Sequence, residues 1–78
     1  MKTEKAVLKE IGDRLRFLRL KKGYTSYETF AIDNNLSRMQ YWRIEKGLTN
    51  ITVRSLMNLL KIHNLTIEEF FTIKLEKI

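Results

Sequence analysis

The chain has 78 residues, 44% of them hydrophobic, which is enough for one folded domain with a modest core. It contains no cysteine, so disulfide frameworks, thiol nucleophiles and cysteine-ligated metal sites are excluded. Lys and Arg total 15 against 9 acidic residues, and the net charge of +6 favours a polyanionic partner without identifying it.

No apolar run approaches the roughly 18 residues that a membrane-spanning helix needs. The amino-terminal stretch "MKTEKAVLKE" is too charged for a signal peptide. We therefore expect a cytoplasmic protein that does not enter a membrane. We also expect residues 1–78 to form a single domain, because no repeat or low-complexity stretch divides them.

The first predicted helix runs from about Thr3 to Lys22. Apolar residues recur in it at the three- and four-residue intervals that place side chains on one helix face: Leu8, Ile11, Leu15 and Leu18. Gly23 follows, and glycine readily adopts the left-handed conformation that commonly ends a helix.

A short second helix is predicted for residues 27–33, because Ser26 can cap it and Phe30 supplies a buried position. An Asn-Asn pair ends it. Asparagine tolerates a positive φ better than any residue except glycine, so Asn35 suits a tight turn. The turn returns Leu36 to the core.

Ser37 opens "SRMQ", a Ser followed three residues later by Gln, which is the capping-box pattern that starts a helix. This third predicted helix runs to Lys46 and is stopped by Gly47. One of its faces carries Tyr41 and Ile44, which suit the core. The other face combines cations with large apolar side chains and indicates a binding surface: Arg38, Met39, Trp42, Arg43 and Lys46.

Thr52 can cap a fourth helix whose apolar positions form one buried face, and Asn64 marks its end. The following motif "TIEE" repeats the capping-box pattern, and Ile67, Phe70 and Phe71 form the apolar stripe of a fifth helix. Five helices in a chain of this length predict a compact all-α domain.

The closing stretch "FTIKLEKI" has two interpretations. Ile73 and Leu75 alternate with polar residues as in a short strand, whereas Phe71, Leu75 and Ile78 also fit an extension of the helical stripe. Both interpretations leave apolar side chains uncovered. We therefore expect a homodimer whose contact surface includes four apolar residues: Phe71, Ile73, Leu75 and Ile78.

In combination these residues resemble the xenobiotic-response-element (XRE), or Cro/CI-type, helix-turn-helix proteins over about residues 11–71. The resemblance lies in "IGDRLRFLRLKKG", "FAIDNNLSRMQYWRIEKG" and "LMNLLKIHNLTIEEFF". Its most specific features are Ala31 in the second helix, the spacing from it to the turn, and the ending "RIEKG". Asn35 stands where the family usually has a turn glycine, and Ile51 replaces a common loop proline. The resemblance implies a lambda-repressor-like fold whose third helix enters the major groove of DNA.

The resemblance also implies roles for single residues. Four are expected to read bases: Arg38, Met39, Trp42 and Arg43. An arginine fork can bond guanine O6 and N7, whereas Met39 can only make apolar contact; Trp42 lies against the groove wall or packs on a neighbour. Six are expected to contact phosphates: Tyr27, Ser37, Gln40, Lys46, Thr49 and Asn50. Arg19 and Glu45 match an ion pair that links the first helix to the third and serves the scaffold.

No residue pattern supports an enzyme, a bound metal or a cofactor. His63 is the single histidine and falls at a position that the family fills with an apolar residue, so we expect it to be half-buried and packed. Glu68 and Glu69 suit the first turn of a helix through its dipole and need no catalytic role.

We therefore expect a sequence-specific DNA-binding transcriptional regulator, most simply a repressor that binds a palindromic operator as a homodimer. Two alternatives stay open. An antitoxin would bind its operator with the same fold and a toxin partner through the long first helix and the apolar tail. A helical interaction module would keep the fold without binding DNA.

Overall fold

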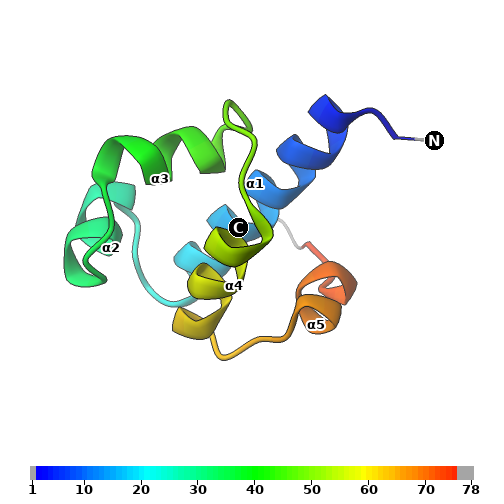
Figure 1. Ribbon diagram of the computed structural model, residues 1–78. Helices are drawn as coiled ribbons and strands as arrows, with labels where there is room; N and C mark the ends of the chain where they lie inside the picture. Colours follow the sequence, from blue (N-terminus) through cyan, green and yellow to red (C-terminus); the bar gives the residue numbers. More distant parts are fainter. Residues whose placement is uncertain (1, 76–78) are drawn as a thin grey trace.

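The computed structural model describes residues 2–75, which form five α-helices and contain no strand. The helices are α1 (Glu4–Lys21), α2 (Tyr27–Asp33), α3 (Arg38–Glu45), α4 (Val53–Ile62) and α5 (Ile67–Thr72). Figure 1 shows α1 crossing the middle of the molecule, with α2 and α3 together on one side and α5 on the other. The predicted five-helix all-α fold is confirmed. None of these helices within residues 2–75 is long and apolar enough to cross a membrane.

Every helix begins at a hydroxyl side chain that accepts a hydrogen bond from a backbone N–H three residues further on. The five caps are Thr3, Ser26, Ser37, Thr52 and Thr66. Such a cap satisfies one of the four N–H groups that a helix start leaves without a partner. This local rule explains why the starts predicted from the sequence lie within one residue of those observed.

The two predicted capping boxes differ in outcome. At α5 the Glu69 carboxylate accepts from the Thr66 N–H at 2.9 Å, so the reciprocal box is complete. At α3 the Ser37 hydroxyl accepts from the Gln40 N–H at 3.3 Å, but the Gln40 side chain returns no bond within the described part of the chain. The Gln40 amide is therefore not used by the cap.

The turns depend on residues with positive φ. Asn35 has a φ of 59°, as predicted for the turn between α2 and α3, and Asn64 has a φ of 55° after α4. Gly23 and Gly47 have φ values of 100° and 70° after α1 and α3. These residues let the chain leave each helix in a new direction, and the helix pairs that pack on one another include α1 with α3, α2 with α3 and α4 with α5.

All five helices contribute to one core. Its buried apolar members are Ile11, Leu15, Phe17, Leu18, Phe30, Ala31, Tyr41, Leu56, Leu59, Leu60 and Phe70. Leu36 and Ile44 are half-buried and pack against this cluster, which agrees with the positions predicted for them.

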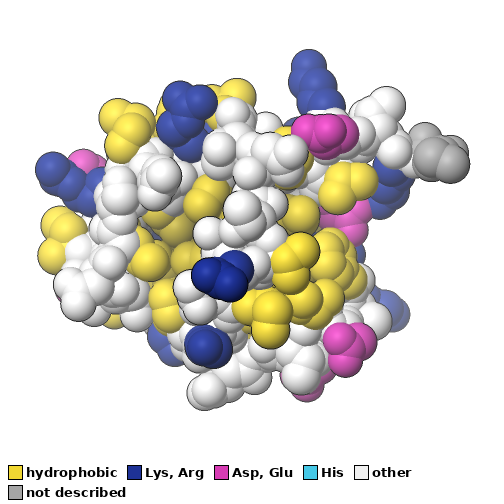
Figure 2. All heavy atoms as spheres, in the orientation of Figure 1, with side chains coloured by type: hydrophobic (Ala, Val, Ile, Leu, Met, Phe, Trp, Pro, Cys, Tyr) yellow, Lys and Arg dark blue, Asp and Glu magenta, His cyan; other side chains and the backbone are white. Residues whose placement is uncertain are grey.

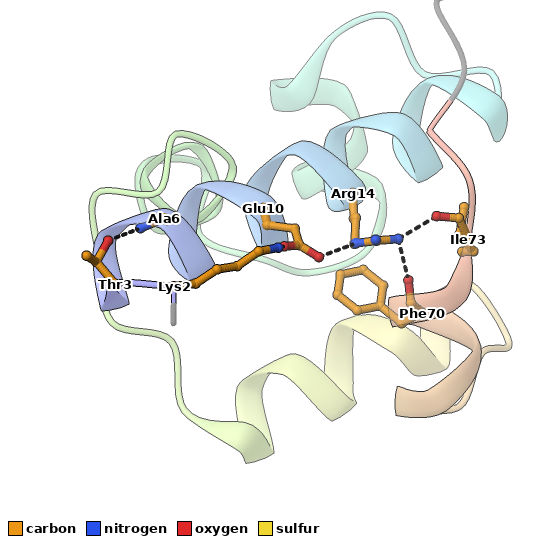
Figure 3. A network of polar contacts seen from close by, with 7 residues as sticks. All are labelled: Lys2, Thr3, Ala6, Glu10, Arg14, Phe70 and Ile73. Carbon is orange, nitrogen blue, oxygen red and sulfur yellow. Dashed lines mark hydrogen bonds and ion pairs between the residues drawn. The ribbon is translucent and has the colours of Figure 1, made fainter.

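The end of the chain differs from both sequence interpretations. Helix α5 ends at Thr72, Ile73 has extended backbone angles (φ −64°, ψ 131°), and residues 73–75 pair with no strand among residues 2–75. The physical reason lies in α1, because the Arg14 guanidinium donates to the carbonyl oxygens of Phe70 at 3.1 Å and Ile73 at 2.6 Å (Figure 3). This side chain caps α5 and turns the tail toward α1. Ile78 lies outside the described residues.

Candidate nucleic-acid interface

Helices α2 and α3 form a packed pair around a short turn. The Leu36 N–H donates to the Ala31 carbonyl at 2.8 Å and closes the turn. The rings of Phe30 in α2 and Tyr41 in α3 lie 5.1 Å apart at a tilt of 42°. The Tyr41 hydroxyl makes no hydrogen bond within residues 2–75, and burial raises its pKa well above the ordinary value. Tyr41 therefore belongs to the core, and α3 turns its opposite face to solvent.

The carboxyl end of α3 is tied to α1 by the ion pair expected from the sequence. Arg19 donates through Nε to Glu45 Oε2 at 2.7 Å and through Nη2 to Oε1 at 3.1 Å. Its Nη1 donates to the carbonyls of Tyr24 at 2.9 Å and Thr25 at 3.0 Å. Both charged side chains are buried, and the hydrogen bonds to Glu45 raise the pKa of Arg19. The arginine thus joins α1, α3 and the connection before α2.

A close approach between α1 and α3 was missed in the sequence. A β-carbon on Gly12 would lie 2.3 Å from the Glu45 carbonyl oxygen, and one on Gly47 would lie 3.1 Å from the Lys9 Cα. Glycine inside a helix costs about 0.5–1 kcal/mol relative to alanine, so its presence in the middle of a predicted helix is itself a sign of a tight contact. That signal was available at Gly12.

The outward face of α3 carries the residues that the sequence assigned to base reading. Arg38, Met39 and Arg43 are exposed, and Trp42 is half-buried. Arg38 lies 3.8 Å from the Glu28 carboxylate, but both side chains are more than half exposed, so this pair holds the arginine only loosely. Figure 2 shows Lys or Arg and hydrophobic side chains projecting together along the edge where α3 lies.

The six residues assigned to phosphate contact lie at both ends of α3 and at the start of α2. Ser37, Gln40, Lys46 and Asn50 are exposed, whereas Tyr27 and Thr49 are half-buried. A cavity of about 150 Å³ separates the start of α3 from α4 and is lined by Ser37 and Gln40 on one side and by Ser55 and Asn58 on the other. The two α4 residues add neutral donors beside the start of α3, and no local motif in the sequence marked them.

The four residues assigned to dimer contact are not equivalent. Phe71 and Leu75 are exposed by 39% and 45%. Ile73 is instead half-buried and packs against the core, where Arg14 holds its backbone, so the prediction that this side chain is exposed was wrong. Ile78 lies outside the described residues.

Exposed apolar side chains on α4, which the sequence assignment omitted, extend this surface. Val53 is 66% exposed and Met57 48% exposed. A cavity of about 360 Å³ lies between Met57 and Ile67. Figure 2 shows a continuous hydrophobic area between α4 and α5. We call the group Val53, Met57, Ile67 and Phe71 the α4–α5 apolar surface.

His63 is half-buried at the end of α4, as predicted. Its ring stacks on Phe30 with centroids 5.6 Å apart and planes within 7°. Burial lowers the pKa of His63, and the charge of Lys22 lowers it further by a smaller amount. Within residues 2–75, no three His, Asp or Glu side chains lie close enough together to hold a metal ion.

Comparison with protein-family models, with curated proteins and with solved structures finds no match for this chain.

Proposed function

We propose that the chain is a cytoplasmic, sequence-specific DNA-binding regulator of the XRE or Cro/CI type, which inserts α3 into the major groove. One observation carries the proposal. Helix α3 buries Tyr41 and Glu45 toward the rest of the domain and leaves Arg38, Met39 and Arg43 exposed on its outer face. A groove-reading helix needs this combination of a rigid inner face and a free outer face rich in donors.

Base reading is the proposed task of Arg38 and Arg43. Each arginine can bond one guanine bidentately, and the weak contact between Arg38 and Glu28 is easily exchanged for such a bond. Met39 offers an apolar surface of the kind that packs on a thymine methyl. Trp42, three positions after Met39, lies on about the same face of α3 and completes the apolar part of the contact.

Phosphate contact is the proposed task of residues around α3. The exposed Lys46 supplies charge, and Gln40, Ser55 and Asn58 supply neutral donors at the cavity beside α4. Because the Gln40 amide is not used by the helix cap, it is free to donate to a phosphate oxygen. The net charge of +6 supports the long-range attraction that such contacts require.

Dimerisation is proposed through the α4–α5 apolar surface and Leu75. This surface is exposed in one copy of the chain, and a two-fold dimer would cover it on both copies while presenting two α3 helices to a palindromic site. A dimer bound across a promoter acts most simply as a repressor. The same apolar surface also suits a toxin, in which case the chain would be an antitoxin.

Selection of bound duplexes from a random DNA pool tests the proposal. We expect enrichment of a palindromic sequence whose half-sites contain guanine. The matched control is the double variant Arg38→Gln, Arg43→Gln, which removes both guanidinium groups but keeps a polar side chain at each position and should enrich no consensus. A pool that stays random with the unmodified, folded protein would contradict DNA reading and favour an interaction module. Co-purification of the chain with a second protein in a fixed ratio would favour the antitoxin.

A further inference from the structure

A second functional feature lies away from α2 and α3, where the end of α1 meets the connection between α4 and α5. A cavity of about 350 Å³ opens there. Phe17, Leu65 and Ile73 supply an apolar floor, and Lys21, Lys22 and His63 stand at its sides. Its volume falls at the lower end of the roughly 300–1,000 Å³ typical of clefts that hold small organic ligands.

The two lysines give the cavity a positive charge that no ion pair among the described residues neutralises. No carboxylate within residues 2–75 pairs with Lys21 or Lys22. The last carbonyls of α1 accept from backbone N–H groups, including Lys22 N–H to Leu18 at 3.0 Å and Gly23 N–H to Leu20 at 3.0 Å. The ammonium groups are therefore not needed to cap the helix.

Helix dipoles do not cancel this charge. The carboxyl ends of α1 and α4 both lie beside the cavity, and each carries a partial negative charge of about half a unit. Two ammonium groups exceed that sum by about one positive charge. Lys21 Nζ also lies 5.7 Å from the centre of the Phe17 ring, so charge and apolar surface adjoin each other at one point of the lining.

We propose that this cavity binds a small organic monoanion, with its apolar body on Phe17, Leu65 and Ile73 and its carboxylate toward Lys21 and Lys22. A neutral apolar molecule would leave the two ammonium groups without an anionic partner. A bare inorganic anion would leave the apolar floor uncovered. The combination selects a carboxylate with a hydrocarbon or aromatic group attached.

The position of the cavity makes its occupant an effector of α2 and α3. His63 lines the cavity and stacks on Phe30 of α2, and Phe30 contacts Tyr41 of α3. A ligand that contacts the His63 ring therefore acts on a group packed directly against α2 and linked to α3 through Phe30. The effect on DNA affinity rests on the proposed function, whereas binding in the cavity does not.

Titration of the full chain with 4-phenylbutyrate, followed by NMR of the His63 ring and the Leu65 and Ile73 methyl groups, tests the site. We expect saturable shifts at these three residues and weaker binding of the neutral 4-phenyl-1-butanol. Lys21→Gln and Lys22→Gln should each weaken phenylbutyrate binding about two- to fivefold, as expected for an exposed charge contact. The control Lys61→Gln removes an exposed lysine that does not line this cavity and should change nothing.

Absence of saturable shifts, equal binding of the acid and the alcohol, or equal weakening by Lys61→Gln would overturn the site. The regulatory link has its own readout, which is the affinity for the selected DNA with and without saturating phenylbutyrate. We expect a change of about fivefold or more, the lower end of typical couplings between two sites. Unchanged DNA affinity with a filled cavity would overturn the link, and absence of DNA binding in both states would instead contradict the proposed function.

Discussion

Gly12 lies so close to Glu45 that a β-carbon on the glycine would fall 2.3 Å from the glutamate carbonyl oxygen. The obstructing atom belongs to the backbone and cannot rotate away. We expect Gly12→Ala to separate α1 from α3, because overpacking usually costs about 1–3 kcal/mol. The better helix propensity of alanine offsets about 1 kcal/mol of this cost, so we expect the free energy of unfolding to fall by up to about 2 kcal/mol. Urea denaturation measures the difference.

The control for Gly12 is Lys5→Ala, at an exposed position of the same helix. We expect it to change the free energy of unfolding by less than about 0.5 kcal/mol. If Gly12→Ala stabilises the protein as its helix propensity alone would predict, the close approach of α1 and α3 is wrong.

Glu45 holds the buried arginine that joins three segments of the chain. Glu45→Ala would leave the charge of Arg19 buried without its carboxylate, so we expect a loss of about 3–5 kcal/mol in the free energy of unfolding. Glu28→Ala removes a carboxylate that is 55% exposed and should cost less than about 1 kcal/mol. The double variant Arg19→Met, Glu45→Met should recover much of the loss, because no charge is then stranded. Equal losses of unfolding free energy for Glu45→Ala and Glu28→Ala would show that the Arg19–Glu45 ion pair does not stabilise the fold.

Local signals explain how much of the fold was predictable. Each helix start depends on a hydroxyl cap next to the helix it serves, and the turn at Asn35 depends on the conformational freedom of that residue alone. The division of α3 into an inner and an outer face follows from helical periodicity. For this reason the exposed positions of Arg38, Met39 and Arg43 could be predicted without knowledge of the tertiary structure.

The end of α5 and the burial of Ile73 were not predicted, because both depend on contacts between distant segments. Arg14 reaches carbonyls 56 and 59 positions along the chain, and no local motif signals that it ends α5. The same contact places Ile73 against the core instead of on the surface. Figure 3 shows Glu10 beside Arg14, and its carboxylate accepts from Arg14 Nε at 3.1 Å, so two turns of α1 cooperate in holding the tail.

We expect the stability of the protein to depend on pH through His63. Its pKa in the folded state lies below the ordinary value of 6.5, so the unfolded chain takes up a proton first as the pH falls. The contribution of neutral His63 is complete above about pH 6.5 and declines as the pH falls toward the lowered value in the folded state. We expect His63→Phe, which keeps the ring stacked on Phe30, to reduce the slope of melting temperature against pH in this window. An unchanged slope would show that other groups cause it.

The roles proposed for Arg43 and Lys46, base reading and phosphate contact, can be distinguished by replacing each residue in turn. If Arg43 bonds a guanine edge, Arg43→Ala should weaken binding of the selected site by about 1–3 kcal/mol and flatten the preference at one position of each half-site. It should barely affect scrambled DNA. If Lys46 contacts only phosphate, Lys46→Ala should weaken both duplexes alike and reduce the slope of log affinity against log salt by about one.

Titration of both variants against selected and scrambled duplexes at several salt concentrations distinguishes these roles. The two residues are three positions apart on one exposed face, and both replacements remove one positive charge, so each serves as the control for the other. If the loss of positive charge were the only effect, each variant would lose the same affinity for the selected duplex as for the scrambled one. A difference confined to Arg43 must come from the geometry of its contact. If Arg43→Ala weakens binding of both duplexes equally, Arg43 contacts phosphate instead of a base. Arg38, nearer the amino end of α3, then becomes the proposed base reader.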